Sequence, residues 1–446
     1  MAQFAIPRRF AFVPLLIAAC HFPNIQIISS FTIVRLVVLA GLLRAAAEIA
    51  SLRAQRQSMD RWFVLWAVWA FLSSFAHQAK ENYNPLTVHL SLIFDYAGTY
   101  LYARTYFREN LDLMRFSKCL AIVLMPLAGL LLVEHVTGKN LYSLVGAMPE
   151  PWVREGRIRA AGPFGNAILA GIVGGVSFPL MMLLLREDRR WALRGLAACL
   201  LIVFSSSSST PFMTLFAGIG ILSLWRWRSL LPRIRLGIIA MLIALALVME
   251  APIWYLIARI DIAGGSTSWH RAELIQQAVE HLGEWWLVGT DYTRHWMPYG
   301  IEWSEDHVDI TNHYINMGVR GGLLLMLSFI VILFKAFQLL GRKMQALRMA
   351  DDPTEFMFWC LGTSLFVHAF TFMAISYFDQ SYVLVSLVLG AVPGLCSSEV
   401  QQVAESEATT VDASMNSAHQ DEPVGRESIL SPQEGALSRS SPPLER

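Results

Sequence analysis

The sequence predicts an all-α membrane protein that crosses the bilayer many times. Hydrophobic residues make up 55% of the 446 residues and charged residues only 15%, and the mean hydropathy is +0.46. Such a chain is too apolar for an ordinary soluble protein. Taking roughly 20 apolar residues as one crossing, we expect about twelve transmembrane helices. Their expected centres lie near Ile17, Leu39, Val68, Tyr96, Pro126, Ile172, Leu201, Ala217, Leu242, Phe329, Leu365 and Leu387.

Positive charge is concentrated in alternate connections between these segments. The basic loops contain Arg53 and Arg61, Arg104 to Lys118, Arg186 to Arg194, Arg226 to Arg235, and Arg342 to Arg348. By the positive-inside rule these loops face the cytoplasm, as do both termini. The opposite loops then face outward, namely a medium loop over about 136–162 and a long, partly helical loop over about 252–319.

Two parts of the chain differ in composition. Residues 1–396 form the expected transmembrane domain, which includes the long loop, whereas residues 397–446 are rich in Ser, Glu, Gln and Pro. This second part has too few large apolar residues to fold alone, so we expect a disordered cytoplasmic tail.

No basic stretch is interleaved with aromatic residues, which excludes a nucleic-acid partner. The five cysteines lie in or beside apolar segments without a CxxC pair, which predicts packing roles.

The long outer loop is the first candidate for chemistry, because the stretch from Trp269 to Gly322 holds five of the eleven histidines. Its first half predicts a helix over 269–282. On helical spacing Arg271 lies on the apolar face of this helix and His270 on the opposite face. A buried arginine there either pairs with a loop carboxylate or meets an anionic ligand, and the sequence leaves both interpretations open.

The second half of the loop offers two candidate general bases, His307 and His313. A histidine at the outer mouth of a helix bundle can accept a proton from a hydroxyl nucleophile near neutral pH. Asp309 is the candidate carboxylate to orient the imidazole. Two other interpretations stay open at this point: surface histidines without a function, and a divalent metal held by Asp306, His307, Asp309 and His313.

Charges elsewhere also depart from the general pattern. Arg157 and Arg159, with Arg154, lie on the outer side, where guanidinium groups suit a phosphate ligand or contact lipid headgroups. Arg35 and Asp95 fall inside expected spans. Because intramembrane charges usually pair, we expect an ion pair between them.

Two short stretches resemble the O-antigen ligase and polysaccharide polymerase superfamily of bacterial inner-membrane glycosyltransferases. In RIRAAGPFGN, Arg157 or Arg159 followed by the turn over 162–166 matches the family pattern, and Arg271 matches an arginine near a helix start. His307, Gly318 and Gly321 fit the family's ligase motif. Val308 departs from that motif, and His313 after Asn312 is the alternative base. The family's Ser-Arg pair corresponds to 205–210, without the arginine.

The resemblance implies a glycosyltransferase-C-like fold and an active site on the periplasmic face of the inner membrane. It implies transfer of a glycan from an undecaprenyl-pyrophosphate carrier to an acceptor glycan or glycolipid, without a metal or another cofactor. Arg157, Arg159 and Arg271 would bind the pyrophosphate, and His307 or His313 would be the base. Ligase and polymerase are not distinguished. The alternatives are a flippase for lipid-linked oligosaccharide and a metal-dependent lipid-phosphate hydrolase.

Overall fold

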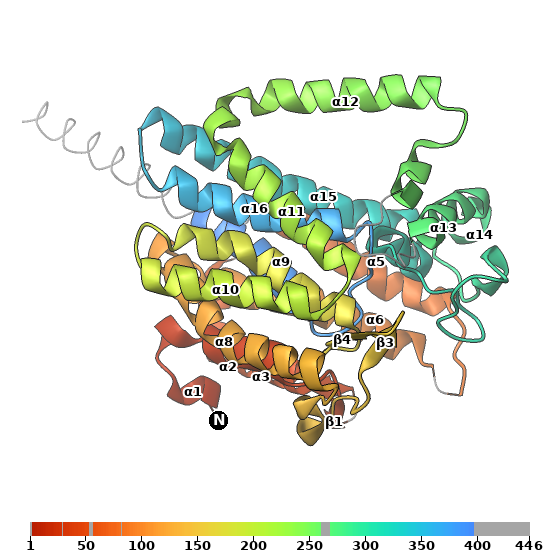
Figure 1. Cartoon of the computed structure of the whole chain (residues 1–446), viewed down its shortest axis with the longest axis horizontal. Helices are drawn as coiled ribbons and strands as arrows, with labels where there is room; N and C mark the ends of the chain where they lie inside the picture. Colours follow the sequence, from red (N-terminus) through yellow and green to blue (C-terminus); the bar gives the residue numbers. More distant parts are fainter. Residues whose placement is uncertain (1, 29, 53–56, 82, 260–267, 397–446) are drawn as a thin grey trace, which may run out of the picture. The chain divides into compact units, whose positions relative to one another are not determined.

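The structure is a computed structural model that describes residues 2–28, 30–52, 57–81, 83–259 and 268–396 (Figure 1). These residues are mostly helical, in agreement with the all-α expectation. By internal contacts the chain divides into two units, Met1–Ser398 and Glu399–Arg446. The tail that was expected to be disordered lies outside the described residues.

Helices follow one another along the whole first unit. The N-terminal elements are α1 (Ala2–Ala5), η1 (Arg8–Phe10), α2 (Phe12–His21), α3 (Ile33–Arg44), α4 (Ala46–Ser51), α5 (Ser58–Ser73), η3 (Ser74–Ala76), α6 (Pro85–Ile93), the π-helical η4 (Phe94–Gly98), α7 (Thr99–Tyr106) and α8 (Asn110–Thr137). Next come η5 (Leu141–Val145), α9 (Ala167–Leu183), α10 (Arg189–Ser205), α11 (Ser209–Ser223), η6 (Leu224–Leu230) and α12 (Leu231–Val248). The last are η7 (Ile253–Arg259), α13 (Ser268–Glu280), α14 (Leu282–Trp285), η8 (Arg294–Trp296), α15 (His313–Met349), α16 (Glu355–Thr371) and the helix Tyr382–Cys396.

Strands are confined to two short antiparallel hairpins. β1 (Gln26–Ile28) pairs with β2 (Phe31–Thr32), and β3 (Trp152–Arg154) pairs with β4 (Arg157–Arg159). In the second hairpin Trp152 is opposite Arg159, and Arg154 is opposite Arg157. Residues directly opposite one another, and residues two apart on one strand, share a face of a hairpin. Three arginines therefore lie on one face of the β3–β4 hairpin.

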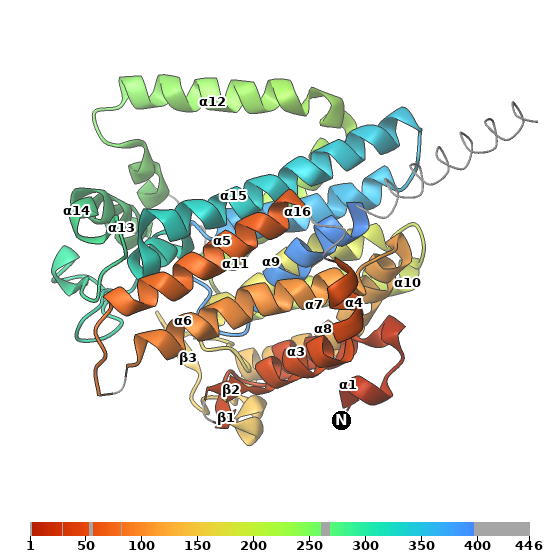
Figure 2. The same cartoon turned by 180° about the vertical axis from the view of Figure 1, so that it is seen from behind.

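The helices pack around one large apolar core, and a smaller apolar cluster joins α13, α14, η8 and the first turns of α15. α8, α9 and α10 lie against one another, α9 also packs on α11 and α16, and α5 packs along α15 (Figures 1 and 2). The long helix α8 begins with a reciprocal capping box between Glu109 and Asp112 and is capped at its other end by Gly138, which is left-handed (φ 72°). The core residues come from nearly all of these helices.

The expectation of about twelve spans is not met. In the described part of the chain, three helical stretches are long and apolar enough to cross a membrane: Asn110–Thr137, Ser209–Val248 and His313–Met349. Two further apolar helices, Ala167–Leu183 and Tyr382–Cys396, are shorter. Every expected centre does lie in a helix. The count differs because apolar stretches are divided into shorter helices, for example by the π-helical turn between α6 and α7.

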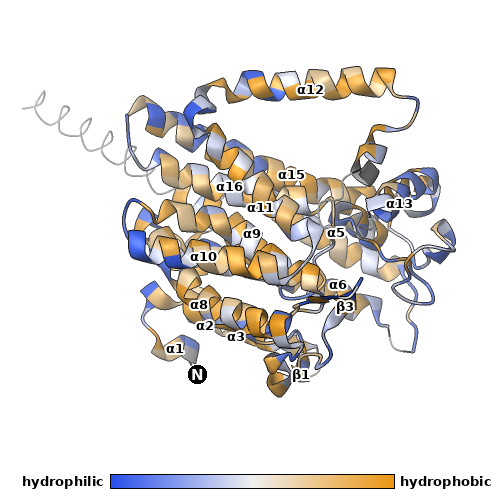
Figure 3. Ribbon diagram, viewed as in Figure 1, coloured by the Kyte–Doolittle hydropathy of each residue, from blue (hydrophilic) through white to orange (hydrophobic). Residues whose placement is uncertain are grey.

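α12 differs from the other long helices in having no buried residue. Its surface is almost wholly apolar, whereas polar residues gather around α13 and α14 (Figure 3). Exposed apolar side chains of this kind suit contact with lipid rather than water.

α15 is broken near its start, and this break shapes the site. Gly321 and Gly322 have non-helical backbone angles, and Gly322 is left-handed (φ 74°). The Trp69 indole of α5 donates a hydrogen bond of 2.6 Å to the Gly321 carbonyl, which has lost its helical partner. The first turns of α15 therefore run in their own direction, with Asn312 capping the helix through Tyr314 N–H and Ile315 N–H.

Candidate functional site

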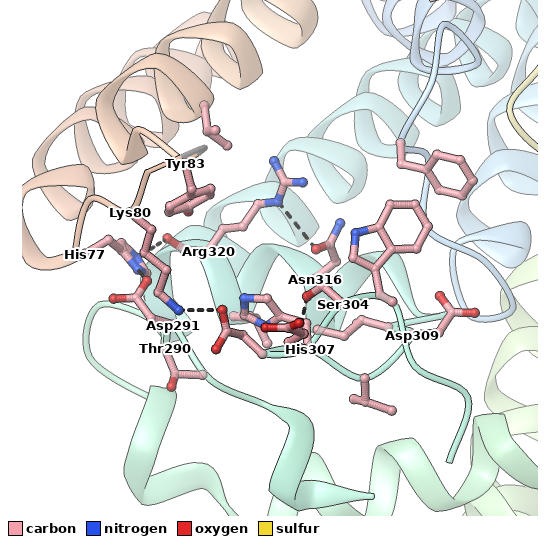
Figure 4. Close-up of a pocket in the computed structure, with 18 of the residues that line it drawn as sticks. His77, Lys80, Tyr83, Thr290, Asp291, Ser304, His307, Asp309, Asn316 and Arg320 are labelled. Atoms are coloured by element: carbon pink, nitrogen blue, oxygen red, sulfur yellow. Dashed lines mark hydrogen bonds and ion pairs between the residues drawn. The ribbon is translucent and has the colours of Figure 1, made fainter. Parts of the chain in front are cut away.

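A cavity of about 640 Å³ lies where the long loop meets the first turns of α15 (Figure 4). Its walls come from four separate parts of the chain: the connection between α5 and α6 with the start of α6, the loop segment 290–310, the first turns of α15, and residues 376–378 after α16. The lining residues include His77, Lys80, Glu81, Tyr83, Thr290, Asp291, Trp303, Asp306, His307, Asp309, Asn316, Arg320 and Phe378. The sequence pointed to this loop, but the α5–α6 wall was not predicted.

His307 lines this cavity and is held in place by Thr293. Nδ1 of His307 lies 3.1 Å from the Thr293 hydroxyl, which also accepts the Val308 N–H at 3.2 Å. Backbone N–H groups of Thr293 and Arg294 donate to the Asp306 carbonyl at 2.9 and 3.0 Å. Partial burial lowers the pKa of His307, so its imidazole is neutral at pH 7. No hydrogen bond within the described chain occupies its Nε2, which a substrate hydroxyl can therefore approach.

His313 has a different environment. It is 1% exposed and lines neither described cavity. Its Nε2 lies 2.9 Å from the Tyr96 hydroxyl, and its Nδ1 accepts the Tyr377 N–H at 3.3 Å. The rings of Phe329 and Phe372 pack beside it. The geometry therefore separates the two candidate bases: His307 faces the cavity, whereas His313 belongs to the packed core.

Asp309 also lines the cavity, but it does not orient His307. Within the described residues its carboxylate makes no hydrogen bond to that imidazole; instead it acts electrostatically on His270 and Arg271. Val308, between the two residues, is fully buried. In an extended chain successive side chains alternate, so His307 and Asp309 both point away from Val308 and towards the cavity. Burial raises the pKa of Asp309, and the nearby His270 and Arg271 oppose this effect.

The prediction of which side chains of the loop helix α13 are buried was partly wrong. Arg271 is buried as predicted, at 7% exposed, but His270 is also buried, at 2% exposed. His270 Nε2 bonds to the Asp309 carbonyl at 2.9 Å, and its Nδ1 is buried without a hydrogen-bond partner among the described residues. α13 is covered on both of these sides because the 309 segment folds back over it, a contact that helical periodicity does not reveal.

Arg159 and Arg271 meet at the start of α11, although they are distant in sequence. Arg159 donates to the Ser208 hydroxyl at 2.8 Å, and Arg271 donates to the Thr210 hydroxyl at 3.1 Å and to the Ala374 carbonyl at 2.8 Å. Within the described chain neither guanidinium has a carboxylate within ion-pair distance, and the Nε of Arg159 is buried without a partner. Burial lowers the pKa of Arg271 to about 10; the charge of Asp309 opposes this effect, and the charges of Arg154 and Arg159 add to it. Arg271 therefore stays charged at pH 7.

Arg157 lies two residues from Arg159 on the same face of the β3–β4 hairpin and is exposed. Of the three expected arginines, Arg271 is therefore buried, Arg159 is half-buried and Arg157 is exposed. The N-terminus of the fifteen-residue helix α11 adds partial positive charge at the same place, because its first N–H groups lack helical partners.

The Gly-Pro-Phe-Gly-Asn turn after β4 acts as the corner that positions Arg159. Buried Glu134 accepts the N–H groups of Ala161 and Gly162 at 3.0 and 2.9 Å. Gly162 is left-handed (φ 58°), and a side chain there would meet Leu131. Asn166 caps α9 by accepting the Ile168 N–H at 2.8 Å. This motif therefore has a structural explanation in the fold.

The glycines after His307 also serve packing. A side chain at Gly318 would clash with the Trp285 ring, and one at Gly322 would clash with the Leu287 carbonyl. These close approaches hold the α14 segment against the first turns of α15. Thr290 N–H donates to the Val319 carbonyl at 2.9 Å in the same contact.

The ion pair expected between Arg35 and Asp95 is present. Nε and one terminal nitrogen of Arg35 each lie 2.7 Å from a carboxylate oxygen of Asp95, and each side chain is 13% exposed. Both residues line a smaller cavity of about 240 Å³. Arg320 lines this cavity and the larger one.

Arg320 is the main site residue that the sequence reasoning missed. Within the described residues, the only hydrogen bond of its guanidinium goes from Nε to the Asn316 side chain at 3.4 Å (Figure 4). A charged residue inside an apolar segment is a signal for function, but the sequence analysis used only the spacing of the neighbouring glycines from His307. His77 and Lys80 were missed because their partners Asp291 and Asp306 lie far along the chain, at 2.6 and 2.5 Å in space.

The metal interpretation of Asp306, His307, Asp309 and His313 is not supported. Asp306 pairs with Lys80, and both ring nitrogens of His313 are engaged in the core. In the described part of the chain, the one group of His, Cys, Asp and Glu donors that converges is His281, Glu284 and His295.

Comparison with known proteins gives no assignment. No protein-family model matches the chain, and no curated protein matches it. Its function has to be inferred from the geometry of its own residues.

Proposed function

We propose that this chain is a bacterial inner-membrane glycosyltransferase that transfers a glycan from an undecaprenyl-pyrophosphate carrier to an acceptor hydroxyl during cell-surface polysaccharide assembly. One observation carries the proposal. Arg159 and Arg271 converge at the N-terminus of α11 without a carboxylate partner among the described residues. A buried guanidinium beside a half-buried one, with no carboxylate within ion-pair distance of either, favours a dianionic ligand, and a pyrophosphate has that charge.

In this proposal the two arginines supply leaving-group stabilisation. When the glycosidic bond to the carrier breaks, negative charge grows on the pyrophosphate oxygen. Preorganised donors that face this oxygen lower the barrier because they need no reorganisation during the reaction. Pyrophosphate is stabilised as an anion and needs no proton from the protein.

His307 is the proposed general base. Its neutral imidazole in the 640 Å³ cavity takes the proton of the acceptor hydroxyl as that oxygen attacks the anomeric carbon. Asp309 lines the same cavity and acts on Arg271, so it is the proposed link between the base and the arginines. Trp303 and Phe378, whose ring centroids lie 5.1 Å apart, offer apolar surfaces on which sugar rings can stack.

The proposal includes a glycosyltransferase-C-like membrane fold with the long loop and this cavity on the periplasmic side. Donor and acceptor are then both lipid-linked or growing glycans at the outer face of the bilayer. Arg157, exposed beside Arg159, is the proposed outer contact for the carrier.

The test uses the full-length protein in lipid nanodiscs with undecaprenyl-pyrophosphate-linked oligosaccharide and an acceptor glycan. Arg271→Lys and Arg159→Lys keep the charge but lose the planar fork, and we expect transfer to fall by about 10²-fold. Arg233→Lys, on exposed α12, is the matched control and should transfer like wild type. Undiminished transfer by both site variants would contradict the proposal. Glycan translocation in proteoliposomes without any transfer would instead indicate a flippase.

A further inference from the structure

A second cluster of titratable side chains lies in the long loop, among residues that do not line the cavity. His281 follows α13, Glu284 lies in α14 and His295 lies in η8. His281 Nδ1 is 2.8 Å from Glu284 Oε1, and His295 Nε2 is 2.9 Å from Glu284 Oε2. One ligand atom from each residue falls within 4.8 Å of the others. Three elements thus converge on one point.

Aromatic residues hold these three side chains in place. The Trp296 indole N–H donates to Glu284 Oε2 at 3.1 Å. The Tyr292 ring lies parallel to His295, with centroids 5.1 Å apart. Partial burial opposes ionisation of Glu284, but hydrogen bonds from Trp296, His295 and His281 lower its pKa to about 2. The carboxylate is therefore charged at any physiological pH.

We propose that His281, Glu284 and His295 bind a divalent transition-metal ion of the Zn²⁺ class. Two imidazoles and one carboxylate form a donor set that such ions prefer. Zn²⁺ binds N and O donors at about 2.0–2.2 Å, so each imidazole nitrogen needs to move away from the Glu284 carboxylate by only about a few tenths of an ångström. Each imidazole coordinates through the nitrogen that faces Glu284 and keeps its proton on the other ring nitrogen. The side chains are 29%, 40% and 36% exposed, so water completes the coordination.

The site has a structural consequence for His307. His295 follows Thr293 by two residues, and Thr293 bonds to the His307 ring and to the Asp306 carbonyl. An ion that ties η8 to α13 and α14 therefore restrains the segment that positions His307. Any effect of the ion on glycan transfer rests on the proposed function. Metal binding and the ordering of the segment around Thr293 do not rest on the proposed function.

The binding test uses the full-length protein in nanodiscs, stripped with a chelator and titrated with Zn²⁺ by calorimetry and with Co²⁺ by absorption spectroscopy. We expect one saturable ion per chain. His281→Ala with His295→Ala should weaken binding by at least about 10-fold, as loss of ligands does. Glu284→Gln keeps an acceptor for the Trp296 N–H and should also weaken binding. Thermal unfolding of each variant establishes that it is folded.

Two substitutions serve as controls. Glu280→Gln alters an exposed carboxylate whose partner is Gln276, and His135→Ala removes a histidine that bonds to the Ile158 carbonyl. Both should bind the ion like wild type. Absence of saturable binding, or binding unchanged in the double variant, would overturn the proposal.

Hydrogen exchange tests the coupling without an activity assay. Zn²⁺ should slow exchange of the amides of Thr293, Arg294 and Val308, and it should have no such effect in the double variant. Binding without this protection would overturn the coupling. If the protein binds Zn²⁺ but transfers no glycan, the metal site is supported and the proposed function is contradicted. The two proposals can therefore fail separately.

Discussion

The Thr293 hydroxyl lies 3.1 Å from Nδ1 of His307 and accepts the Val308 N–H at 3.2 Å, so one side chain fixes both the ring and the backbone beside it. For Nε2 to act as a base, Nδ1 must keep its proton and donate it to this hydroxyl. Thr293 is therefore a positioning residue, and its effect should be separable from that of the base itself.

We expect Thr293→Val, which keeps the shape and removes the hydroxyl, to lower kcat for glycan transfer by about 10-fold with little change in KM. Thr311→Val is the matched control, because the Thr311 hydroxyl is buried without a hydrogen-bond partner in the described residues. Steady-state transfer kinetics check both variants. Equal effects of the two substitutions would show that Thr293 does not position the base.

Substitution of His307 should impair glycan transfer, whereas substitution of His313 should impair stability. His307→Ala should lower transfer by about 10²-fold or more and leave thermal stability nearly unchanged, since the ring lines a cavity. His313→Ala leaves the Tyr96 hydroxyl and the Tyr377 N–H without partners in the core, and each unsatisfied group costs about 1–3 kcal/mol. Thermal unfolding in detergent and transfer assays separate the two. A stable, inactive His313→Ala protein together with an active His307→Ala protein would reverse the assignment.

The pH profile of transfer should report the environment of His307. Burial lowers the pKa of His307, with Lys80 and Arg320 in the same direction and Asp306 and Asp291 opposing them. The imidazole is the base only when neutral, so activity is full at pH 7 and is lost as the pH falls through this lowered pKa. The acid limb should therefore lie below about pH 6.5, the ordinary value for histidine.

Asp306→Asn tests this cause. The substitution removes a charge that raises the pKa of His307, so the acid limb should move to lower pH. Glu302→Gln, at a carboxylate that pairs with Arg294, is the control and should leave the limb in place. A shift to higher pH in Asp306→Asn would contradict the assignment of His307 as the base.

The left-handed backbone conformation at position 322 should require glycine. Its φ of 74° is unfavourable for other residues, and a side chain would clash with the Leu287 carbonyl. We expect Gly322→Ala to lower the free energy of unfolding by more than about 1 kcal/mol. Gly341→Ala lies later in α15, where a side chain meets nothing within 4 Å, and should be neutral or stabilise by about 0.5–1 kcal/mol. Equal thermal stabilities of the two variants would contradict this account.

The sequence predicted those features that depend on local pattern or on an unusual residue type. Apolar periodicity located the helices and the buried face of Arg271, and the rule that intramembrane charges pair identified Arg35 with Asp95. It did not predict that His77 and Lys80 form a wall of the cavity, because those contacts join segments more than 200 residues apart. Burial of His270 was missed because the Asp309 segment, 39 residues later, folds back over α13, and helical periodicity does not reveal such a contact. The expected number of spans was wrong because many apolar stretches form helices too short to cross a membrane, for example where the π-helical turn separates α6 from α7.

The Arg35–Asp95 pair should be more important for stability than for the proposed chemistry. Asp95→Asn leaves a guanidinium that is 13% exposed without its carboxylate, and breaking such a buried pair costs about 3–5 kcal/mol. We expect lower expression and a lower unfolding temperature for Asp95→Asn and for Arg35→Gln. The exchanged variant, Arg35→Asp with Asp95→Arg, should recover part of this loss, and Arg8→Gln, at an exposed pair with Glu48, should change little. Tolerance of both single substitutions, measured by thermal unfolding in detergent, would show that the pair contributes nothing to the fold.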